Sequence, residues 1–347
     1  MIFSKKILAW YAENKRDLPW RNTVNPYNIW LSEIMLQQTR VAQGTPYYLK
    51  FIKIFPSVND LANASEEKIL KLWQGLGYYS RARNLHATAK LVSEKYNGNF
   101  PNSYNELLQL KGVGDYTASA IASISFDIPE PVVDGNVYRV LSRYFGVTLP
   151  INSSDGIKYF KELARKVMDT DHIRDYNQGI MEFGAIQCTP KNPSCNDCPL
   201  NSSCVALKEK KVGELPVKLK KLKIKNRYFN YLVIIDEHNR TVLQQRIGKG
   251  IWQHLYEFPL IELDQDIPLD KSEIDKRLKK LLIFDEEYEV YPLNENKIIH
   301  KLSHQHLYTT FWVLNVVGNI PDGIKVSEIG KYPVPVLIAD FIKTFKF

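Results

Sequence analysis

All four cysteines of this chain lie in one short segment, with the spacing Cys188-x6-Cys195-x2-Cys198-x5-Cys204. Four thiols in one loop indicate a metal site, because disulfides are rare in cytosolic proteins and two of them here would close only very small loops. Zinc usually takes two short Cys-x2-4-Cys pairs, and this segment has one. The spacing therefore favours a [4Fe-4S] cluster, with a zinc site as the alternative.

The length of 347 residues predicts two domains, since one domain usually takes roughly 150 residues. A hydrophobic content of 44% and a charged content of 24% exclude a disordered, collagen-like or coiled-coil chain. No apolar run of membrane-spanning length and no apolar signal segment occur, so we expect a soluble cytoplasmic protein without a membrane partner. The net charge of +8 suits an anionic partner such as nucleic acid.

From residue 4 to about 187 the apolar residues recur at steps of three and four, which predicts an all-α first domain. Serines that suit helix starts separate these segments: Ser57, Ser65, Ser80 and Ser154. The predicted helices cover residues 66–73, 79–92, 104–108, 116–124, 135–145 and 157–168.

Residues 208–227 hold nine Lys and Arg against two Glu, which is most of the net charge. We interpret residues 208–226 as a basic interdomain linker, either a solvated connector or a strap near phosphates. Beyond it the pattern is mixed α/β. A β-hairpin is predicted from residues 227–235 and 241–246, a strand over 307–314, and helices near 272–282 and 335–345.

Residues 110–118 place Gly112 and Gly114 around a tight turn before a predicted helix. Glycines allow the backbone to approach an anion closely, and the free N–H groups of a helix start favour negative charge. Many Gly-x-Gly pairs are only turns. With the helix that follows, this one has the outline of a helix-hairpin-helix DNA-binding element, in which Lys111 is placed to contact a phosphate.

Two carboxylates stand out. Glu33 lies on a predicted helix that is apolar nearly all round, so we expect burial to raise its pKa and let it donate a proton near neutral pH. Asp134 immediately precedes another helix, where it would serve as an N-cap held ionised with a depressed pKa. A raised and a depressed carboxyl together are expected of glycosidic bond cleavage. The alternatives are a Glu on a solvated face and an Asp that only caps a helix.

Taken together, these motifs resemble the adenine DNA glycosylases of the MutY type, within the helix-hairpin-helix base-excision superfamily. The likeness covers essentially the whole chain, and its motifs lie at residues 18–21, 26–27, 32–39, 75–81, 112–118, 133–139, 188–204, 252–259 and 302–304. It implies a helix-hairpin-helix glycosylase domain over residues 1–207 with the [4Fe-4S] loop at 188–204, then a Nudix-like lesion-recognition domain over 227–347.

The resemblance also implies roles for single residues. Glu33 matches the acid that protonates N7 of a flipped adenine, and Asp134 matches the carboxylate that stabilises the sugar cation. Tyr116 stands where bifunctional relatives keep a Schiff-base lysine, which implies a monofunctional enzyme. Arg21 and Asn136 match residues that line the adenine pocket or support the carboxylates. Gln38 and Tyr78 match residues that insert into the duplex. A structural salt bridge, a helix start or core packing is the alternative for these four.

The second domain lacks a Gly-x5-Glu-x7-Arg-Glu box, so we expect it to recognise 8-oxoguanine without hydrolysing nucleotides. The family's Phe-Ser-His element is Leu302-Ser303-His304 here, which removes aromatic surface but keeps Ser303 and His304 as hydrogen-bond donors to the lesion base and a phosphate.

The expected function is that of a monomeric, nucleoid-associated monofunctional glycosylase, which excises adenine opposite 8-oxoguanine or guanine in duplex DNA during base excision repair. The alternatives are a bifunctional thymine-glycol glycosylase and lyase, a Nudix hydrolase fused to a DNA-binding domain, and a non-catalytic lesion-binding protein.

Overall fold

The computed structural model describes residues 2–219, 224–281, 288–345 and 347. Its contacts divide the chain into two compact units, Met1–Ala64 with Arg83–Lys220, and Ser65–Ala82 with Lys221–Phe347. Residues 65–82 contribute to the second unit because Lys71 and Tyr79 donate hydrogen bonds to the carbonyls of Tyr332 (2.9 Å) and Val334 (3.3 Å). The domain limits at residues 207 and 227 stay a prediction, and three of the predicted linker's lysines lie outside the described residues.

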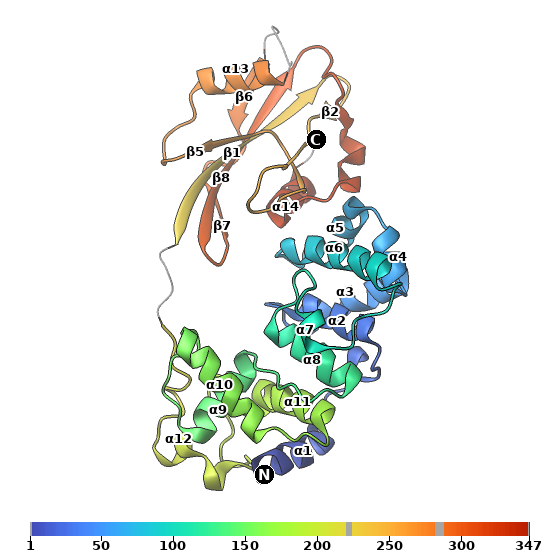
Figure 1. Cartoon of the computed structure of the whole chain (residues 1–347). Helices are drawn as coiled ribbons and strands as arrows, with labels where there is room; N and C mark the ends of the chain where they lie inside the picture. The colour runs from blue at the N-terminus through green and yellow to red at the C-terminus, as the bar shows by residue number, and fades with distance from the viewer. Residues whose placement is uncertain (1, 220–223, 282–287, 346) are drawn as a thin grey trace. The chain divides into compact units, whose positions relative to one another are not determined.

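The first unit is helical, which confirms the predicted all-α class (Figure 1). It contains α1 (Ile2–Asn14), α2 (Pro26–Leu36), α3 (Val41–Ile54), α4 (Val58–Asn63), most of α6 (Ser80–Lys95), α7 (Tyr104–Leu107), α8 (Asp115–Phe126), α9 (Gly135–Phe145), α10 (Ser154–Val167), α11 (Ile173–Glu182) and α12 (Val205–Lys208). Short 3-10 turns cover Pro19–Arg21 and Asn201–Ser203, and a π-helical turn covers Phe183–Gln187.

Helix α2 is the central element for the site, and its sequence explains its place. Every residue from 29 to 35 is buried, because α2 packs against both α3 and α8 and has no solvated face. Pro26 occupies its first turn, and Asn25 caps it by accepting the N–H of Tyr27 (2.9 Å). Helix α8 is buried in the same way from Thr117 to Ile124.

Most of the predicted helix starts are where the serines indicated. Ser57 forms a capping box with Asp60, and Ser65 caps α5 (Glu66–Trp73), which lies within the second unit. At α10 the cap is Ser153, one residue before the predicted Ser154.

The second unit is built on a mixed sheet with the order β5-β1-β8-β6. Strand β1 (Lys225–Asp236) runs parallel to β8 (Gln305–Val316), and β5 (Leu260–Leu263) pairs antiparallel with β1. On the other side of β8, β6 (Tyr288–Pro292) and β7 (Ile298–Lys301) pair with successive halves of it (Figure 1). Helices α13 (Lys271–Lys280) and α14 (Val336–Thr344) complete the predicted α/β class, and a 3-10 turn covers Val326–Lys331.

Alternation along β8 shows that both faces of this sheet are buried. Leu314 packs with Ile274 and Leu278 of α13. Phe311, three residues earlier and therefore on the opposite face, stacks on Phe341 of α14 with ring centroids 4.1 Å apart. Burial on both faces explains the long apolar run of the predicted strands.

The predicted hairpin between residues 227–235 and 241–246 is wrong. Strand β1 is paired on both sides by β5 and β8, while β2 (Arg240–Thr241) pairs with β9 (Ile324–Lys325) and β3 (Gln244–Gln245) with β4 (Tyr256–Glu257). The buried Asp236 explains the change, because its carboxylate accepts the N–H groups of His238, Arg240 and Ile320 and so turns the chain toward β9.

Among the described helices, none combines the length and apolar character needed to cross a membrane.

Candidate functional site

The first unit brings Glu33, Tyr116 and Asp134 into one electrostatic group, although they come from three different elements. Glu33 lies on α2, Tyr116 is in the first turn of α8, and Asp134 is the N-cap of α9. The charges of Glu33 and Asp134 each raise the pKa of the Tyr116 phenol, and the charge of Asp134 raises that of Glu33.

Glu33 is the buried acid of this group. Its side chain lies among the apolar residues of α2, and the residue is 8% exposed. Burial raises the pKa of Glu33 to about 7, as the apolar helix predicts; the nearby charge of Asp134 also raises it, while the Tyr116 hydroxyl and Arg21 lower it. Near neutral pH a large share of Glu33 therefore carries a proton.

Tyr116 contacts Glu33 and also approaches Met181 of α11, with its hydroxyl oxygen 3.2 Å from the sulfur. Burial and the two carboxylates raise the pKa of Tyr116 well above its usual value, so the phenol stays neutral. A neutral phenol donates its hydrogen to an ionised Glu33 in preference to a thioether, because a charged acceptor gives the stronger bond.

Asp134 caps α9, as predicted. Its carboxylate accepts the backbone N–H groups of Asn136 (2.9 Å) and Val137 (2.8 Å), and the side-chain amide of Asn136 (2.7 Å). The predicted depressed pKa is wrong in direction, because burial raises the pKa of Asp134 and the three N–H groups offset only part of that effect. Asn136 supports the carboxylate, and its own oxygen accepts a hydrogen bond from Arg139 (2.9 Å).

Arg21 forms a buried ion pair behind the site. Its Nη2 lies 2.6 Å from Glu182 at the end of α11, and Arg16 lies 2.7 Å from the same carboxylate. Burial by itself raises the pKa of Glu182, but hydrogen bonds from Arg16 and Arg21 outweigh this effect and lower the pKa to about 2. No motif of the sequence singles out Glu182, and its only signal there is a carboxylate among the apolar residues Ile180, Met181 and Phe183.

The glycine turn between α7 and α8 is exposed, with Lys111 on its rim. Gly112 has φ +81°, and a Cβ there would lie 2.9 Å from Cβ of Asn84, so both the backbone and the space require glycine. Gly114 has φ −96° and caps α8, and no heavy atom lies within 4 Å of where its Cβ would be. The structure is thus open at Gly114, directly before the first turn of α8.

Gln38 and Tyr78 are exposed residues with positive φ, of 58° and 48°. Gln38 lies two residues after the end of α2, and Tyr78 lies in the turn before α6 with its side chain outside the core at 45% exposure. The core-packing alternative for Tyr78 therefore fails.

The four cysteines line one cavity, which Arg143 and Val212 also border. Arg143 is buried, with Nη1 3.4 Å from Sγ of Cys188, and Nη1 and Nη2 bind the carbonyls of Thr189 and Pro190. Arg139 binds the carbonyl of Cys188 (2.7 Å), so two arginines of α9 hold the cysteine loop. All four thiols are free and partly buried.

Within the described part of the chain, no three His, Cys, Asp or Glu side chains are arranged to hold a metal ion. Four thiols around one cavity supply the number of thiolate ligands that a [4Fe-4S] cluster or a zinc ion takes. A buried arginine beside the sulfurs fits the negative charge of thiolate ligands. The donor set therefore fits a [4Fe-4S] cluster.

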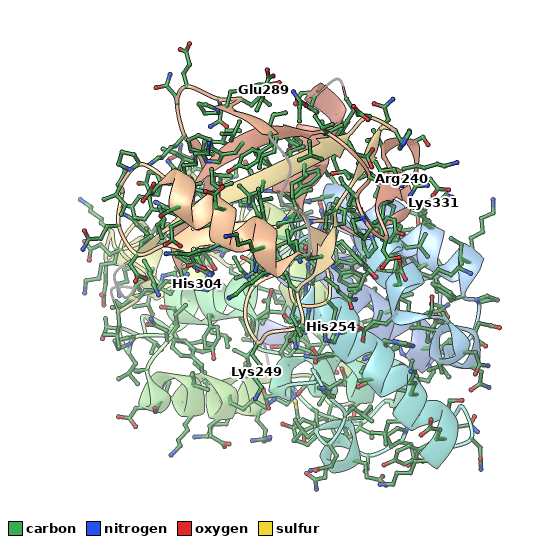
Figure 2. The ribbon with its side chains drawn as sticks, turned by 90° about the horizontal axis from the view of Figure 1, so that it is seen from above. Arg240, Lys249, His254, Glu289, His304 and Lys331 are labelled. Atoms are coloured by element: carbon green, nitrogen blue, oxygen red, sulfur yellow. The ribbon has the colours of Figure 1, made fainter. Side chains whose placement is uncertain are left out.

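Leu302, Ser303 and His304 form the turn between β7 and β8 in the second unit, closed by a hydrogen bond from Leu302 N to the carbonyl of Gln305 (2.8 Å). Ser303 and His304 are exposed, and Figure 2 labels His304 among the surface side chains of this unit. His300, on the strand before, packs against Trp252.

Comparisons with known proteins agree with this two-part architecture. Residues 31–166 match the model of the HhH-GPD superfamily base excision DNA repair proteins, and residues 230–344 match the NUDIX domain. The adenine DNA glycosylase of Buchnera aphidicola (subsp. Baizongia pistaciae) is 39% identical over 320 residues, covering 90% of this chain and 86% of that protein. That of Arabidopsis thaliana is 35% identical, covering 92% of this chain and 58% of that protein.

Among solved structures, a thermostable thymine-DNA glycosylase is similar in fold and sequence. It has a TM-score of 0.56 and 32% identity, over 60% of this chain and 96% of that one.

Proposed function

Because this chain belongs to the adenine DNA glycosylase family of base excision repair, with an HhH-GPD domain and a NUDIX domain, we propose that it excises adenine mispaired with 8-oxoguanine or guanine in duplex DNA. The observation that carries the proposal is the buried Glu33, whose pKa of about 7 supplies a proton beside Tyr116 and Asp134. We further propose that the protein acts as a monomer.

The proposed reaction uses these groups in order. The adenine is rotated out of the duplex, and Glu33 donates its proton to N7 of the ring. The bond between C1′ and N9 then breaks, and its electron pair leaves with the base. Asp134 stabilises the positive sugar by its negative charge, and water adds to C1′ and gives up a proton, leaving an abasic site.

We propose that hydrolysis is the whole reaction and that the enzyme does not cut the strand. A lyase step needs an amine to form a Schiff base with C1′, and Tyr116 occupies the position where such a lysine would stand. Lys111 is exposed on the hairpin turn, where it suits contact with a phosphate.

Cys188, Cys195, Cys198 and Cys204 would hold a [4Fe-4S] cluster, which would brace the loop that Arg139 and Arg143 bind to α9. We expect about four irons and four sulfides per chain, measured by chemical analysis of protein purified without oxygen. One zinc per chain and no sulfide would support the zinc alternative instead.

The proposed role of the second unit is to read the base opposite the adenine. The turn at Ser303 and His304 exposes hydrogen-bond donors, and the chain lacks the Gly-x5-Glu-x7-Arg-Glu box of nucleotide hydrolysis.

Gln38 and Tyr78 would fill the space left in the duplex by the rotated base.

The test is a single-turnover assay on duplexes with one labelled pair: adenine opposite 8-oxoguanine, guanine or thymine, and thymine opposite guanine. We expect release of adenine from the first two, with strand breaks only after alkali. Glu33→Gln, which keeps the size of the side chain but cannot donate the proton in the same way, should lose at least about 1000-fold in rate while still binding the duplex.

Each rival has its own outcome in this assay. Release of thymine would show that this enzyme acts on thymine, as the name of the similar thymine-DNA glycosylase describes for that protein. Strand breaks without alkali would reveal a lyase. Binding with no base released would leave a lesion-binding protein, and pyrophosphate from free nucleotides would reveal a Nudix hydrolase.

A further inference from the structure

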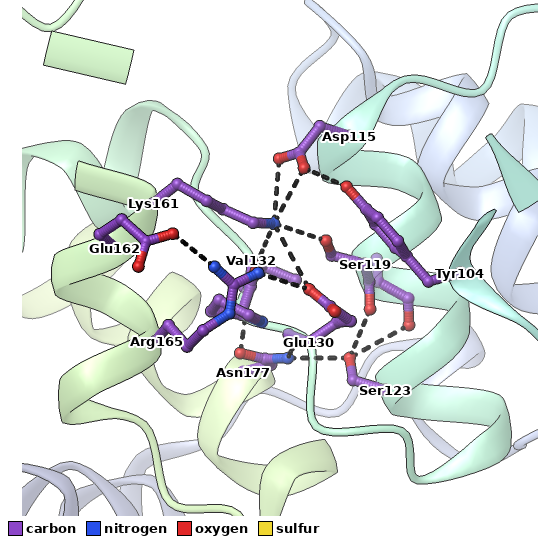
Figure 3. A network of polar contacts seen from close by, with 12 residues as sticks. Tyr104, Asp115, Ser119, Ser123, Glu130, Val132, Lys161, Glu162, Arg165 and Asn177 are labelled. Atoms are coloured by element: carbon purple, nitrogen blue, oxygen red, sulfur yellow. Dashed lines mark hydrogen bonds and ion pairs between the residues drawn. The ribbon is translucent and has the colours of Figure 1, made fainter. Parts of the chain in front are cut away.

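A partly buried cluster of polar side chains lies between α8, α10 and α11, outside the carboxylate group described above. Figure 3 shows Lys161 of α10 pointing into it, toward Asp115, Ser119 and Glu130. The side chain of Lys161 is 15% exposed, which is low for a lysine.

The ammonium of Lys161 uses its three hydrogens on three partners. It donates to the carboxylate of Asp115 (3.1 Å), the hydroxyl of Ser119 (2.8 Å) and the backbone carbonyl of Pro131 (2.9 Å). The first two belong to the start of α8, and the third belongs to the segment that leads to Asp134. One side chain thus joins two parts of the chain that both supply the site.

The segment from Asp127 to Asp134 has no helix or strand of its own. Asn177 of α11, which is fully buried, accepts the N–H of Val132 (3.3 Å) and donates to the carbonyl of Glu130 (2.8 Å). Together with the bond from Lys161 to Pro131, these side-chain contacts hold three successive residues just before Asp134 (Figure 3).

We propose that Lys161 is a positioning residue for the reaction, which keeps Asp134 at its distance from Tyr116 and Glu33 by joining Pro131 to the first turn of α8. Tyr116 directly follows Asp115, and Asp134 lies three residues after Pro131, so two hydrogen-bond partners of the Lys161 ammonium are close in sequence to the reacting groups. Carbocation stabilisation by a carboxylate depends steeply on distance, and a displacement of about 1 Å can cost 100-fold in rate.

A second effect of Lys161 has to be separated from the first. Asp115 is half exposed at the hairpin where a phosphate would bind, and its negative charge opposes an anion there. Lys161 offsets that charge. If this were its only role, removing the charge of Asp115 would make Lys161 dispensable.

The experiment is a double-mutant cycle on the full chain, with single-turnover adenine release and duplex affinity measured separately. The inference rests on the proposed function. We expect Lys161→Met to lower the rate at least about tenfold with an affinity within about threefold of the wild type. We expect the double variant with Asp115→Asn and Lys161→Met to release adenine as slowly as Lys161→Met alone. Lys161→Arg should recover part of the wild-type rate. Lys166→Met, an exposed lysine of the same helix, is the matched control and should match the wild type.

Two outcomes overturn the inference: a wild-type rate for Lys161→Met, or recovery of the wild-type rate when Asp115→Asn is added. Hydrogen exchange of residues 132–137 gives a readout without substrate, and we expect faster exchange in Lys161→Met than in Lys166→Met.

If the wild type releases no base from any duplex, the proposed function fails. Hydrogen exchange then tests the positioning role separately, and unchanged exchange of residues 132–137 in Lys161→Met overturns it. Should Lys161→Met not fold, the same exchange measured in Lys161→Arg decides, and a wild-type rate together with wild-type exchange in that variant counts against the proposal.

Discussion

At the scale of single residues, the state of the Glu33 proton depends mainly on burial. Its few polar neighbours act in opposite directions, since the Tyr116 hydroxyl and Arg21 favour the anion while Asp134 disfavours it. Asp134 is different, because three N–H groups oppose the effect of burial there. The two carboxylates thus differ in how many hydrogen-bond donors each one has, and the larger number at Asp134 favours it as the anion of the proposed reaction.

This predicts how the reaction depends on pH. The acid form of Glu33 is lost as pH rises through about 7, so the single-turnover rate should fall above that pH, approaching tenfold per unit. The measurement is the rate between pH 5.5 and 9 at saturating enzyme. A rate that rises steadily over this range would contradict proton donation by Glu33.

The same raised pKa predicts an effect on stability. Because burial raises the pKa of Glu33 from its ordinary 4.5 to about 7 in the folded protein, the native state loses stability as pH rises from about 4.5 to about 7, and the loss is complete above that range. Glu33→Gln removes the ionisation, so its free energy of unfolding should exceed that of the wild type at pH 8 by up to about 3 kcal/mol, with the gain shrinking toward pH 5. Denaturant unfolding at the two pH values measures this, and an equal difference at both would argue against a buried, protonated Glu33.

At the scale of elements, the turn between α7 and α8 combines an unusual backbone with an open surface. Gly112 needs its positive φ and has Asn84 beside it, whereas Gly114 has ordinary backbone angles and free space around it. Substitution of Gly112 therefore tests a structural role of the turn, and substitution of Gly114 tests a binding role.

We predict that Gly112→Ala lowers the free energy of unfolding by at least about 1 kcal/mol and weakens duplex binding. Gly114→Ala should change stability by less than about 0.5 kcal/mol and still weaken binding about fivefold, because its methyl group would obstruct the N–H groups of α8. Thermal unfolding and fluorescence anisotropy with duplex DNA test the pair. Unchanged affinity in Gly114→Ala would exclude a phosphate at this turn.

At the scale of the whole molecule, the proposal assigns base removal to the first unit and recognition of the opposite base to the second. The turn at residues 302–304 has leucine where the family's Phe-Ser-His element has phenylalanine, so the proposed recognition would depend on the polar groups of Ser303 and His304.

We predict that His304→Ala reduces the preference for adenine opposite 8-oxoguanine over adenine opposite guanine by about tenfold, with little change in the rate at the guanine pair. His238→Ala, in the exposed turn after β1, is the control and should leave the preference intact. The ratio of the two single-turnover rates is the measurement. An equal loss at both pairs would indicate general DNA contact.

Much of the architecture could be inferred from local patterns, because apolar spacing, capping serines and cysteine spacing act over a few residues. The helices over 66–73 and 135–145, the cap at Asp134 and the mixed α/β second unit are of this kind. The raised pKa of Glu33 belongs here too, since an all-apolar helix can only be buried on every side.

Other features depend on groups far apart in sequence, and only the folded chain determines them. The pairing of β1 with β8 joins residues about 80 positions apart and replaced the expected hairpin. The same holds for Glu182 beneath Arg21, for the raised pKa of Asp134 and for Lys161 between α8 and Pro131. In each case desolvation or a long-range partner sets the outcome, and neither is encoded in the neighbouring residues.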